Sequence, residues 1–227
     1  MERKIVLTAD GSTTILIPQL DEQYHSMHGA VQEAQHVFLK TGVDHWMEQN
    51  PTKHDLAIFE IGFGTGLNAL LTMMHLADKN LSVYYEGVEK YPVSLQEIKQ
   101  LNYIEQLGAE GEGTKKQFLT MHESPWEEPI PLSRKFILRK RKQDFANITD
   151  EARHDLIYFD AFGAQVQPEL WGELIFQKMF TAMKPGGVLV TYAAKGSVRR
   201  AMQTVGFTVE RLPGPPGKRE MLRACKI

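Results

Sequence analysis

Hydrophobic positions change their spacing along the chain, and the change marks the elements that we expect. Near the start, two short apolar runs flank Asp10-Gly11, which predicts a β-hairpin of residues 4–8 and 13–17. From residue 56 onward, short apolar runs alternate with stretches that carry apolar side chains at helical spacing. We expect strands at residues 56–61, 82–88, 117–121, 135–139, 155–159, 188–193, 208–212 and 221–226. We expect helices at residues 29–41, 43–49, 66–76, 93–103, 168–183 and 197–203.

This alternation predicts an α/β fold with a mostly parallel, twisted, doubly wound sheet. The last two strands flank a Gly/Pro-rich turn and are expected to form an antiparallel hairpin. We expect a single domain over 1–227, in which a hairpin and helical extension (1–54) precedes a Rossmann-like core (55–227). In such a sheet ligands bind at the carboxyl ends of the strands, where the strand order reverses.

A glycine-rich loop lies at the first such strand end. Gly62, Gly64 and Gly66 follow a predicted strand and open a predicted helix, so the backbone can turn sharply and approach a ligand closely. A dinucleotide-binding loop needs a further glycine where Leu67 stands. S-adenosylmethionine has no pyrophosphate, and its amino-acid moiety needs room rather than contacts to a helix terminus. The loop therefore favours S-adenosylmethionine as cofactor and a class I methyltransferase fold.

Acidic residues end the successive predicted strands. Glu60 is expected to bind the cofactor's amino group, directly or through water, and Glu89 its ribose hydroxyls. Asp144 is expected near the adenine amino group, with Phe145 beside the ring. Asp160 ends the fourth strand of the core, where it would face the reactive methyl group, and it is the catalytic candidate. The same carboxylates also fit ordinary roles as turn, capping or solvated residues.

Composition narrows the class of protein further. The chain is 42% hydrophobic and 24% charged with a net charge of −2, so any RNA contact must come from local basic clusters. Cys225 is the single cysteine, and no Cys/His spacing indicates a metal site. No apolar run approaches the roughly 20 residues of a membrane span. We expect a cytoplasmic protein that contacts no membrane and needs no metal.

Four segments carry a resemblance to a known family. They are residues 33–39 (EAQHVFL), 60–68 (EIGFGTGLN), 158–162 with 168–171 (YFDAF and PELW), and 196–200 with 217–221 (GSVRR and GKREM). Spread over nearly the whole chain, they make it similar to the methyltransferase domain of the tRNA 5-methylaminomethyl-2-thiouridine biosynthesis (MnmC-like) family. The relatives continue into an oxidase, whereas this sequence ends at Ile227, which suggests a stand-alone form. At Gly163-Ala164-Gln165 it departs from the relatives' Ala-Pro pair.

The resemblance implies methyl transfer from S-adenosylmethionine to the aminomethyl nitrogen of a wobble uridine in the anticodon loop of tRNA. A separate enzyme would then supply the aminomethyl uridine. The match implies that the following residues line the cofactor pocket and catalytic floor: Glu33, Glu60, Gly62, Gly64, Gly66, Asn68, Glu89, Asp144 and Asp160. Substrate contacts are expected from an aromatic side chain that stacks on the base and from basic side chains: Phe162, Lys195, Arg199, Lys218 and Arg219. The basic run 139–142 is a further candidate for RNA contact.

Three other functions remain open on the sequence alone. A small-molecule amine N-methyltransferase would share the cofactor site and lack the RNA contacts. An aminopropyltransferase-like enzyme would need a second acidic residue close to Asp160, and residues 161–167 contain none. A non-enzymatic RNA-binding scaffold would keep the fold without the chemistry, against which the intact glycines and strand-end carboxylates argue.

Overall fold

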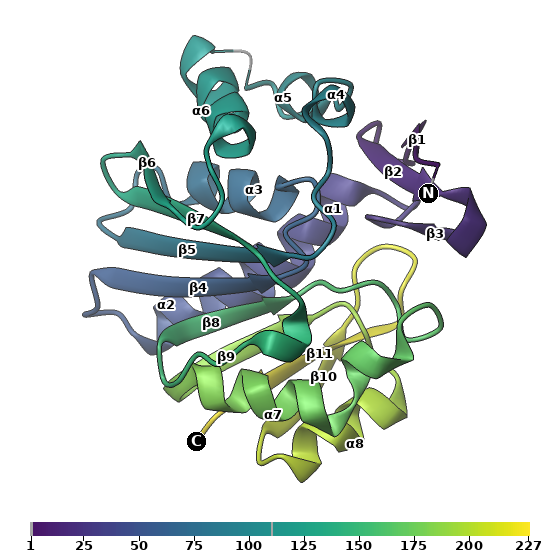
Figure 1. Ribbon diagram of the computed structural model, residues 1–227. Coiled ribbons are helices and arrows are strands. Elements are labelled where there is room, and N and C mark those ends of the chain that lie inside the picture. The colour runs from purple at the N-terminus through teal and green to yellow at the C-terminus, as the bar shows by residue number, and fades with distance from the viewer. Residues whose placement is uncertain (1, 110) are drawn as a thin grey trace.

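The computed structural model describes residues 2–109 and 111–227 and is built around an eight-stranded sheet in the order β10-β11-β9-β8-β4-β5-β7-β6 (Figure 1). Neighbours among β4, β5, β7, β8 and β9 run parallel, whereas β6, β10 and β11 pair antiparallel. The strands are β4 (Asp55–Ile61), β5 (Ser82–Glu89), β6 (Pro129–Ser133), β7 (Phe136–Lys142), β8 (His154–Phe159), β9 (Met183–Thr191), β10 (Thr208–Pro213) and β11 (Glu220–Cys225).

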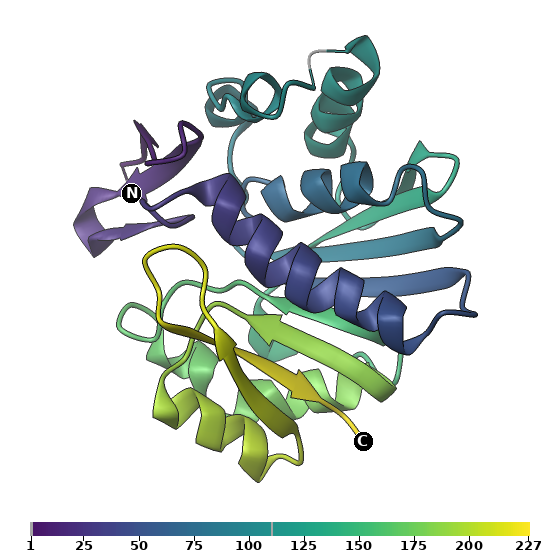
Figure 2. The same ribbon diagram turned by 180° about the vertical axis from the view of Figure 1, so that it is seen from behind.

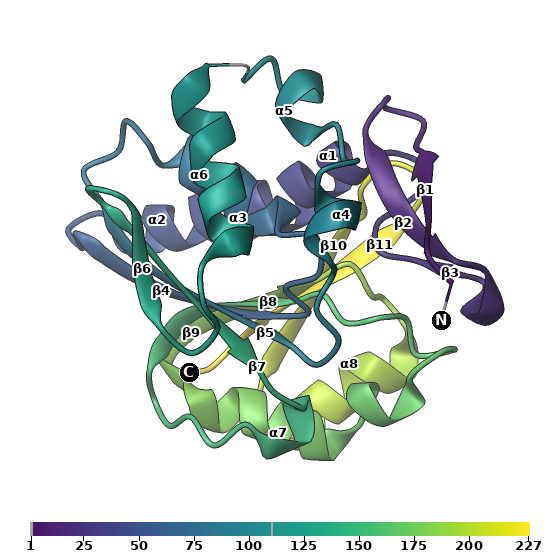
Figure 3. The same ribbon diagram turned by 45° about the horizontal axis from the view of Figure 1, so that its top comes forward.

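Helices cover both faces of this sheet (Figure 3). One face carries α1 (Ala30–Ala34), α2 (His45–Gln49), α3 (Leu67–His75), α4 (Leu95–Ile98), α5 (Tyr103–Gln106) and α6 (Glu112–Glu123), and the other α7 (Glu173–Ala182) and α8 (Gly196–Thr204). Each layer buries its own apolar core against the sheet. Within the part of the chain that the structure describes, none of the helices has the length and apolar character that a membrane crossing needs.

The strand order reverses between β4 and β8. The chain leaves the central strand β4 for β5 and β7 on one side, and then returns to β8 and β9 on the other. Helices that cover opposite faces diverge at such a point and leave a crevice at the carboxyl ends of the two strands. This crevice lies next to the glycine loop, as the sequence predicts.

A second, three-stranded sheet packs beside that crevice: β1 (Lys4–Leu7), β2 (Thr13–Ile17) and β3 (Glu22–Gln23). The side chain of Asn102 fastens its hairpin. Asn102 Oδ1 accepts hydrogen bonds from Thr13 N and Oγ1 at 2.8 and 3.0 Å, and Nδ2 donates to Gly11 O at 2.9 Å. At the other end of β1, Arg3 donates to Tyr91 O at 3.0 Å and pairs with Glu97. The small sheet is thereby held against the segment that follows β5.

The parallel sheet, the N-terminal hairpin and the C-terminal antiparallel hairpin are confirmed. The predicted strand at 117–121 is wrong, because these residues lie in α6. Phe118 and Met121 stand three residues apart and are both buried, which is the spacing of one helix face rather than of a strand. An apolar run of five residues is too short to distinguish the two periods.

Other boundaries also differ from the expectation. The helices expected at 29–41 and 43–49 form one run, in which a π-helical stretch (Gln35–Asp44) joins α1 to α2. Gly42 lies inside this run because it packs closely on the sheet, where an added Cβ would lie 3.1 Å from Val190 Cγ2. The helix expected at 93–103 is two short helices, α4 and α5. The one expected at 168–183 begins as a 3₁₀ turn (Pro168–Trp171), and strand β9 already starts at Met183.

The strand β6 was not predicted, because its two prolines remove backbone donors. Pro129 and Pro131 are tolerated there because β6 is the last strand at its edge of the sheet. Two further 3₁₀ helices are described, at Pro18–Leu20 and Phe145–Asn147. Figure 2 shows the long helical run of residues 30–49 crossing the face of the sheet from the small sheet toward the far end of β4.

We predict that Asn102→Ala loosens the N-terminal sheet. The substitution leaves the buried Thr13 without its side-chain acceptor, so the free energy of unfolding should fall by about 1–3 kcal/mol. Amide hydrogen exchange in residues 4–17 should accelerate, measured by mass spectrometry. Asn80→Ala, at an exposed position, is the matched control. Unchanged exchange in the hairpin would show that this attachment is not what holds the small sheet.

Candidate active site

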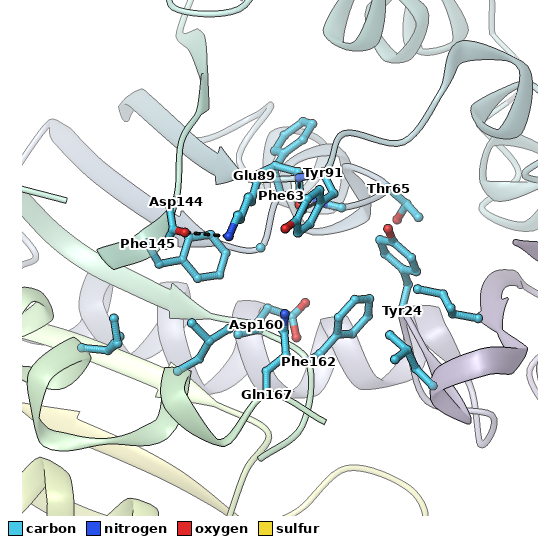
Figure 4. Close-up of a pocket in the computed structure, with 18 of the residues that line it drawn as sticks. Tyr24, Phe63, Thr65, Glu89, Tyr91, Asp144, Phe145, Asp160, Phe162 and Gln167 are labelled. Atoms are coloured by element: carbon cyan, nitrogen blue, oxygen red, sulfur yellow. Dashed lines mark hydrogen bonds and ion pairs between the residues drawn. The ribbon is translucent and has the colours of Figure 1, made fainter. Parts of the chain in front are cut away.

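A cavity of about 830 Å³ opens at the carboxyl ends of β4, β5 and β8 (Figure 4). Its walls come from the glycine loop, the segments after β5, β7 and β8, and the small N-terminal sheet. The size is that of pockets that hold small molecules and cofactors. The predicted site residues that line it are Gly62, Gly64, Asn68, Glu89, Asp144, Phe145, Asp160 and Phe162.

The glycine loop needs glycine at three of its positions. Gly62 has φ +92°, and an added Cβ would lie 2.5 Å from the carbonyl oxygen of Asp160. Gly64 has φ +49° and lies beneath the ring of Tyr24, with 3.0 Å from an added Cβ to Tyr24 Cδ1. Gly66, φ +72°, packs on His122 outside the cavity lining. The three glycines thus bring β4, β8 and the small sheet together around one loop.

At the cavity floor, Asn68 joins the buried carboxylate of Glu60 to the partly buried carboxylate of Asp160. Asn68 Nδ2 donates to Glu60 Oε1 at 2.8 Å and to Asp160 Oδ2 at 2.9 Å. The second oxygen of Glu60 accepts from the Tyr85 hydroxyl at 2.9 Å. Burial, with the nearby Asp160 carboxylate, raises the pKa of Glu60 well above its usual range. Asn68 lines the cavity, whereas Glu60 lies behind it, outside the lining.

Asp160 is the titratable group best placed for chemistry. It follows β8, and its carboxyl points into the cavity (Figure 4). Burial and the Glu33 carboxylate raise the pKa of Asp160 to about 7, against the hydrogen bond from Asn68 and the charge of Lys218. A carboxyl with that proton affinity can take up or release a proton at neutral pH.

Carboxylates also follow β5 and β7. Glu89 accepts from Tyr91 N at 2.8 Å and from Gly64 N at 3.1 Å, and burial raises its pKa. Lys90, the neighbour of Glu89, pairs with Asp144 at 2.7 Å, and this hydrogen bond lowers the pKa of Asp144. Phe145 follows in a short 3₁₀ turn and turns its ring toward the cavity (Figure 4). Two carboxylates and a ring therefore line the part of the cavity at the carboxyl ends of β5 and β7.

The small sheet supplies lining residues that the sequence did not indicate. The Tyr24 ring meets Phe162 edge to face, with 5.0 Å between ring centroids and 83° between planes (Figure 4). His25 also lines the cavity, and desolvation lowers its pKa to about 4, so the imidazole is neutral at physiological pH. Gln167, after β8, also lines the cavity. Only the tertiary packing brings residues 24 and 25 here, since no motif surrounds them in the sequence.

Several predicted residues do not line the cavity. Glu33 is buried nearby and pairs with Lys218, whose Nζ lies 3.9 Å from the centroid of the Tyr192 ring. Lys195 donates to Gln165 Oε1 at 3.1 Å. The predicted residues outside the described lining are Glu33, Glu60, Gly66, Lys195, Arg199, Lys218 and Arg219.

The basic run 139–142 binds within the protein. Arg139 pairs with Glu86 at 2.9 Å and Arg141 with Asp150 at 2.7 Å. Lys140 Nζ caps the end of α6 by donating to His122 O and Ser124 O, both at 2.9 Å. Glu86 and Asp150 lie with His154 in a group of the kind that can ligate a metal, but arginine side chains already bind the two carboxylates. Arg139, Lys140 and Arg141 therefore bind other groups of the protein and stabilise the fold.

We predict that Asp160→Asn stabilises the folded protein at alkaline pH. The pKa of Asp160 is higher in the folded protein than in the unfolded chain. As the pH rises from the unfolded-state pKa toward 7, the unfolded chain loses this proton first, so the free energy of unfolding falls. Removing the charge should raise the free energy of unfolding near pH 8 by at most about 4 kcal/mol, and by less near pH 5. Urea unfolding checks this, with exposed Asp78→Asn as control. A variant no more stable than the parent near pH 8 would contradict the assignment.

The chain is similar in sequence to known methyltransferases. Residues 137–227 match a family model described as S-adenosyl-L-methionine-dependent methyltransferase. The chain is 29% identical to the tRNA 5-methylaminomethyl-2-thiouridine biosynthesis bifunctional protein MnmC of Leptospira interrogans, over 96% of this chain and 34% of that protein. To MnmC of Idiomarina loihiensis it is 32% identical over 89% of this chain and 35% of the relative. It thus spans about a third of the length of the curated relatives it matches.

Solved structures share the fold. MnmC2 from Aquifex aeolicus matches with a TM-score of 0.79 and 24% identity over 99% of this chain and 70% of that one. A probable spermidine synthase from Corynebacterium glutamicum matches with a TM-score of 0.56 and 16% identity, over 98% and 76% of the two chains. The C-terminal part of the chain therefore matches a model of S-adenosyl-L-methionine-dependent methyltransferases, and nearly the whole chain is similar to the corresponding third of the MnmC proteins.

Proposed function

We propose that this chain methylates the aminomethyl nitrogen of a modified wobble uridine in tRNA. The observation that carries the proposal is the Asp160 carboxyl in the cavity lining, whose pKa of about 7 suits an amine acceptor, beside an aromatic pair that suits a base. The substrate itself comes from the relatives, whose name refers to tRNA 5-methylaminomethyl-2-thiouridine biosynthesis.

The cavity fits the cofactor. Its volume suits a ligand of that size, and the loop that forms one wall has a glycine at Gly62, where an added Cβ would lie 2.5 Å from backbone. Asn68 Oδ1 is buried without a hydrogen-bond partner among the described residues, so it offers an acceptor to an amino group. We propose that Glu60 acts through Asn68 as a positioning residue, because both of its oxygens are already bound. Glu89 would hold the ribose hydroxyls, and Asp144 with Phe145 the adenine.

Asp160 would supply the proton chemistry. When bound, S-adenosylmethionine supplies an electrophilic methyl group on a sulfonium, which a neutral amine nitrogen can attack. Alkyl amines are largely protonated at neutral pH, so the acceptor must lose a proton. The Asp160 carboxylate can accept that proton and hold the nitrogen in line, and it is already fixed by the hydrogen bond from Asn68.

Aromatic and basic side chains would hold the RNA. Phe162, paired with Tyr24 at the cavity wall, can stack on an extruded base. Lys195, Arg199 and Arg219 carry charges that can bind phosphates around the opening. We propose a cytoplasmic setting, where tRNA is modified, and chemistry that requires no metal. The acceptor needs its amine before it reaches this site, so another active site, on a separate enzyme, would make the aminomethyl group.

A small-molecule amine N-methyltransferase is the second candidate. It is favoured by the internal pairing of the run 139–142, which removes the largest basic cluster from RNA binding. An aminopropyl acceptor site needs a second carboxylate beside Asp160, but residues 161–167 contain none, and Glu33 lies outside the described lining and pairs with Lys218. Both candidates predict product from free amines without tRNA.

The test is transfer of labelled methyl from S-adenosylmethionine to tRNA that carries unmethylated aminomethyl uridine. We expect label in the wobble nucleoside, and a loss of about 100-fold or more in Asp160→Asn, because a general base contributes about that much. Asp78→Asn, the same change at an exposed position, should behave as the parent. Label in free amines and none in tRNA would replace the tRNA proposal with the small-molecule one.

We predict that Gly62→Ala weakens cofactor binding. The new Cβ would lie 2.5 Å from the Asp160 carbonyl in a backbone conformation that side chains rarely adopt, so the loop must move. Calorimetry should show affinity for S-adenosylmethionine lower by about tenfold or more, equivalent to about 1.4 kcal/mol. Gly172→Ala is the control, because no atom lies within 4 Å of an added Cβ there. Equal affinity in both variants would place the cofactor away from this loop.

A further inference from the structure

A partly buried ion pair fastens the loop between β10 and β11 to α1, next to the cavity. Lys218 Nζ contacts Glu33 Oε1, and the second oxygen of Glu33 accepts from Ser26 N at 2.9 Å. Figure 2 shows this loop reaching the start of α1 beside the small sheet. Glu33 is only 7% exposed, so its charge acts on neighbours within the protein rather than on solvent.

The pair connects to Asp160 through Tyr192. Lys218 Nζ lies 3.9 Å from the centroid of the Tyr192 ring, and the Tyr192 hydroxyl donates to Ala161 O at 2.8 Å. Ala161 is the residue after Asp160. The same loop is held by Gly217, φ +81°, which packs on His28 so closely that an added Cβ would lie 2.1 Å from its ring. The cation of Lys218 therefore has a fixed place beside the site.

We propose that Glu33 and Lys218 are positioning residues that set the electrostatic environment in which Asp160 takes up the proton of the acceptor amine. The role of Asp160 in methyl transfer rests on the proposed function, whereas the effect of the pair on the Asp160 carboxyl does not. In this role Lys218 acts on Asp160 instead of binding an RNA phosphate, and Glu33 acts on Asp160 instead of contacting the cofactor.

Glu33 and Lys218 act on the pKa of Asp160 in opposite directions. Burial and Glu33 raise the pKa of Asp160, and Lys218 lowers it. The other titratable groups described near this region are acids and phenols on or beside the neighbouring strands: Glu22 on β3, Glu60 on β4, Tyr85 on β5 and Tyr192 directly after β9. Lys218 thus offsets part of a negative environment, which keeps the carboxyl both ionisable and basic near pH 7.

The test is a titration of the Asp160 carboxyl by carbon-13 NMR in aspartate-labelled protein, assigned with Asp160→Asn. Glu33→Gln should lower the Asp160 pKa and Lys218→Met should raise it, each by about one pH unit, and the double variant should lie near the parent. Lys218→Arg keeps the charge and should restore the parent titration. Lys115→Met, at an exposed position on α6, is the control for losing a lysine.

Unchanged titration of Asp160 in both single variants would overturn the proposal, whether or not the protein methylates tRNA. Shifts of the same sign would overturn it too, because they would report a general disturbance of the fold. Opposite shifts without methyl transfer to tRNA would support the positioning pair and count against the proposed acceptor. With an active preparation, the acid limb of the pH–rate profile should move in the same two directions.

Discussion

The amide of Asn68 holds a buried and a partly buried carboxylate in one place, and the candidate active site depends on this contact. Its Nδ2 donates to Glu60 on β4 and to Asp160 after β8, the two strands between which the strand order reverses. Buried carboxylates are costly unless they are protonated or hydrogen-bonded. Here burial raises both pKa values, so the Asp160 carboxyl can take up a proton near neutrality, which suits the proposed base for an amine acceptor.

The small N-terminal sheet turns this strand-end crevice into an enclosed cavity. Tyr24 lies over Gly64 and meets Phe162, so one ring bridges the glycine loop and the segment after β8. Asn102 and Arg3 hold the sheet there from the segment after β5. The region that distinguishes this protein from a bare Rossmann-like core thus supplies one wall of the site, where an acceptor would be selected.

Features that depend on local sequence pattern could be predicted from the sequence, whereas features that depend on contacts between distant segments could not. Alternating strands and helices, the glycine loop and the strand-end positions of Glu89 and Asp160 follow from periodicity and spacing, and the structure has them. The strand expected at 117–121 is helical because its short apolar run fits both periods. No local pattern shows that Tyr24 reaches the cavity, or that Lys218 pairs with Glu33 far away in the chain.

The central claim is that the cavity holds S-adenosylmethionine with its methyl group directed at Asp160. A crystal structure of the complex with S-adenosylmethionine tests this most directly. The account predicts the cofactor's amino group at Asn68 Oδ1, its ribose at Glu89, and its methyl group facing the Asp160 carboxyl across a space that an amine can fill. A cofactor bound elsewhere, or with its methyl group turned away from Asp160, would contradict the account.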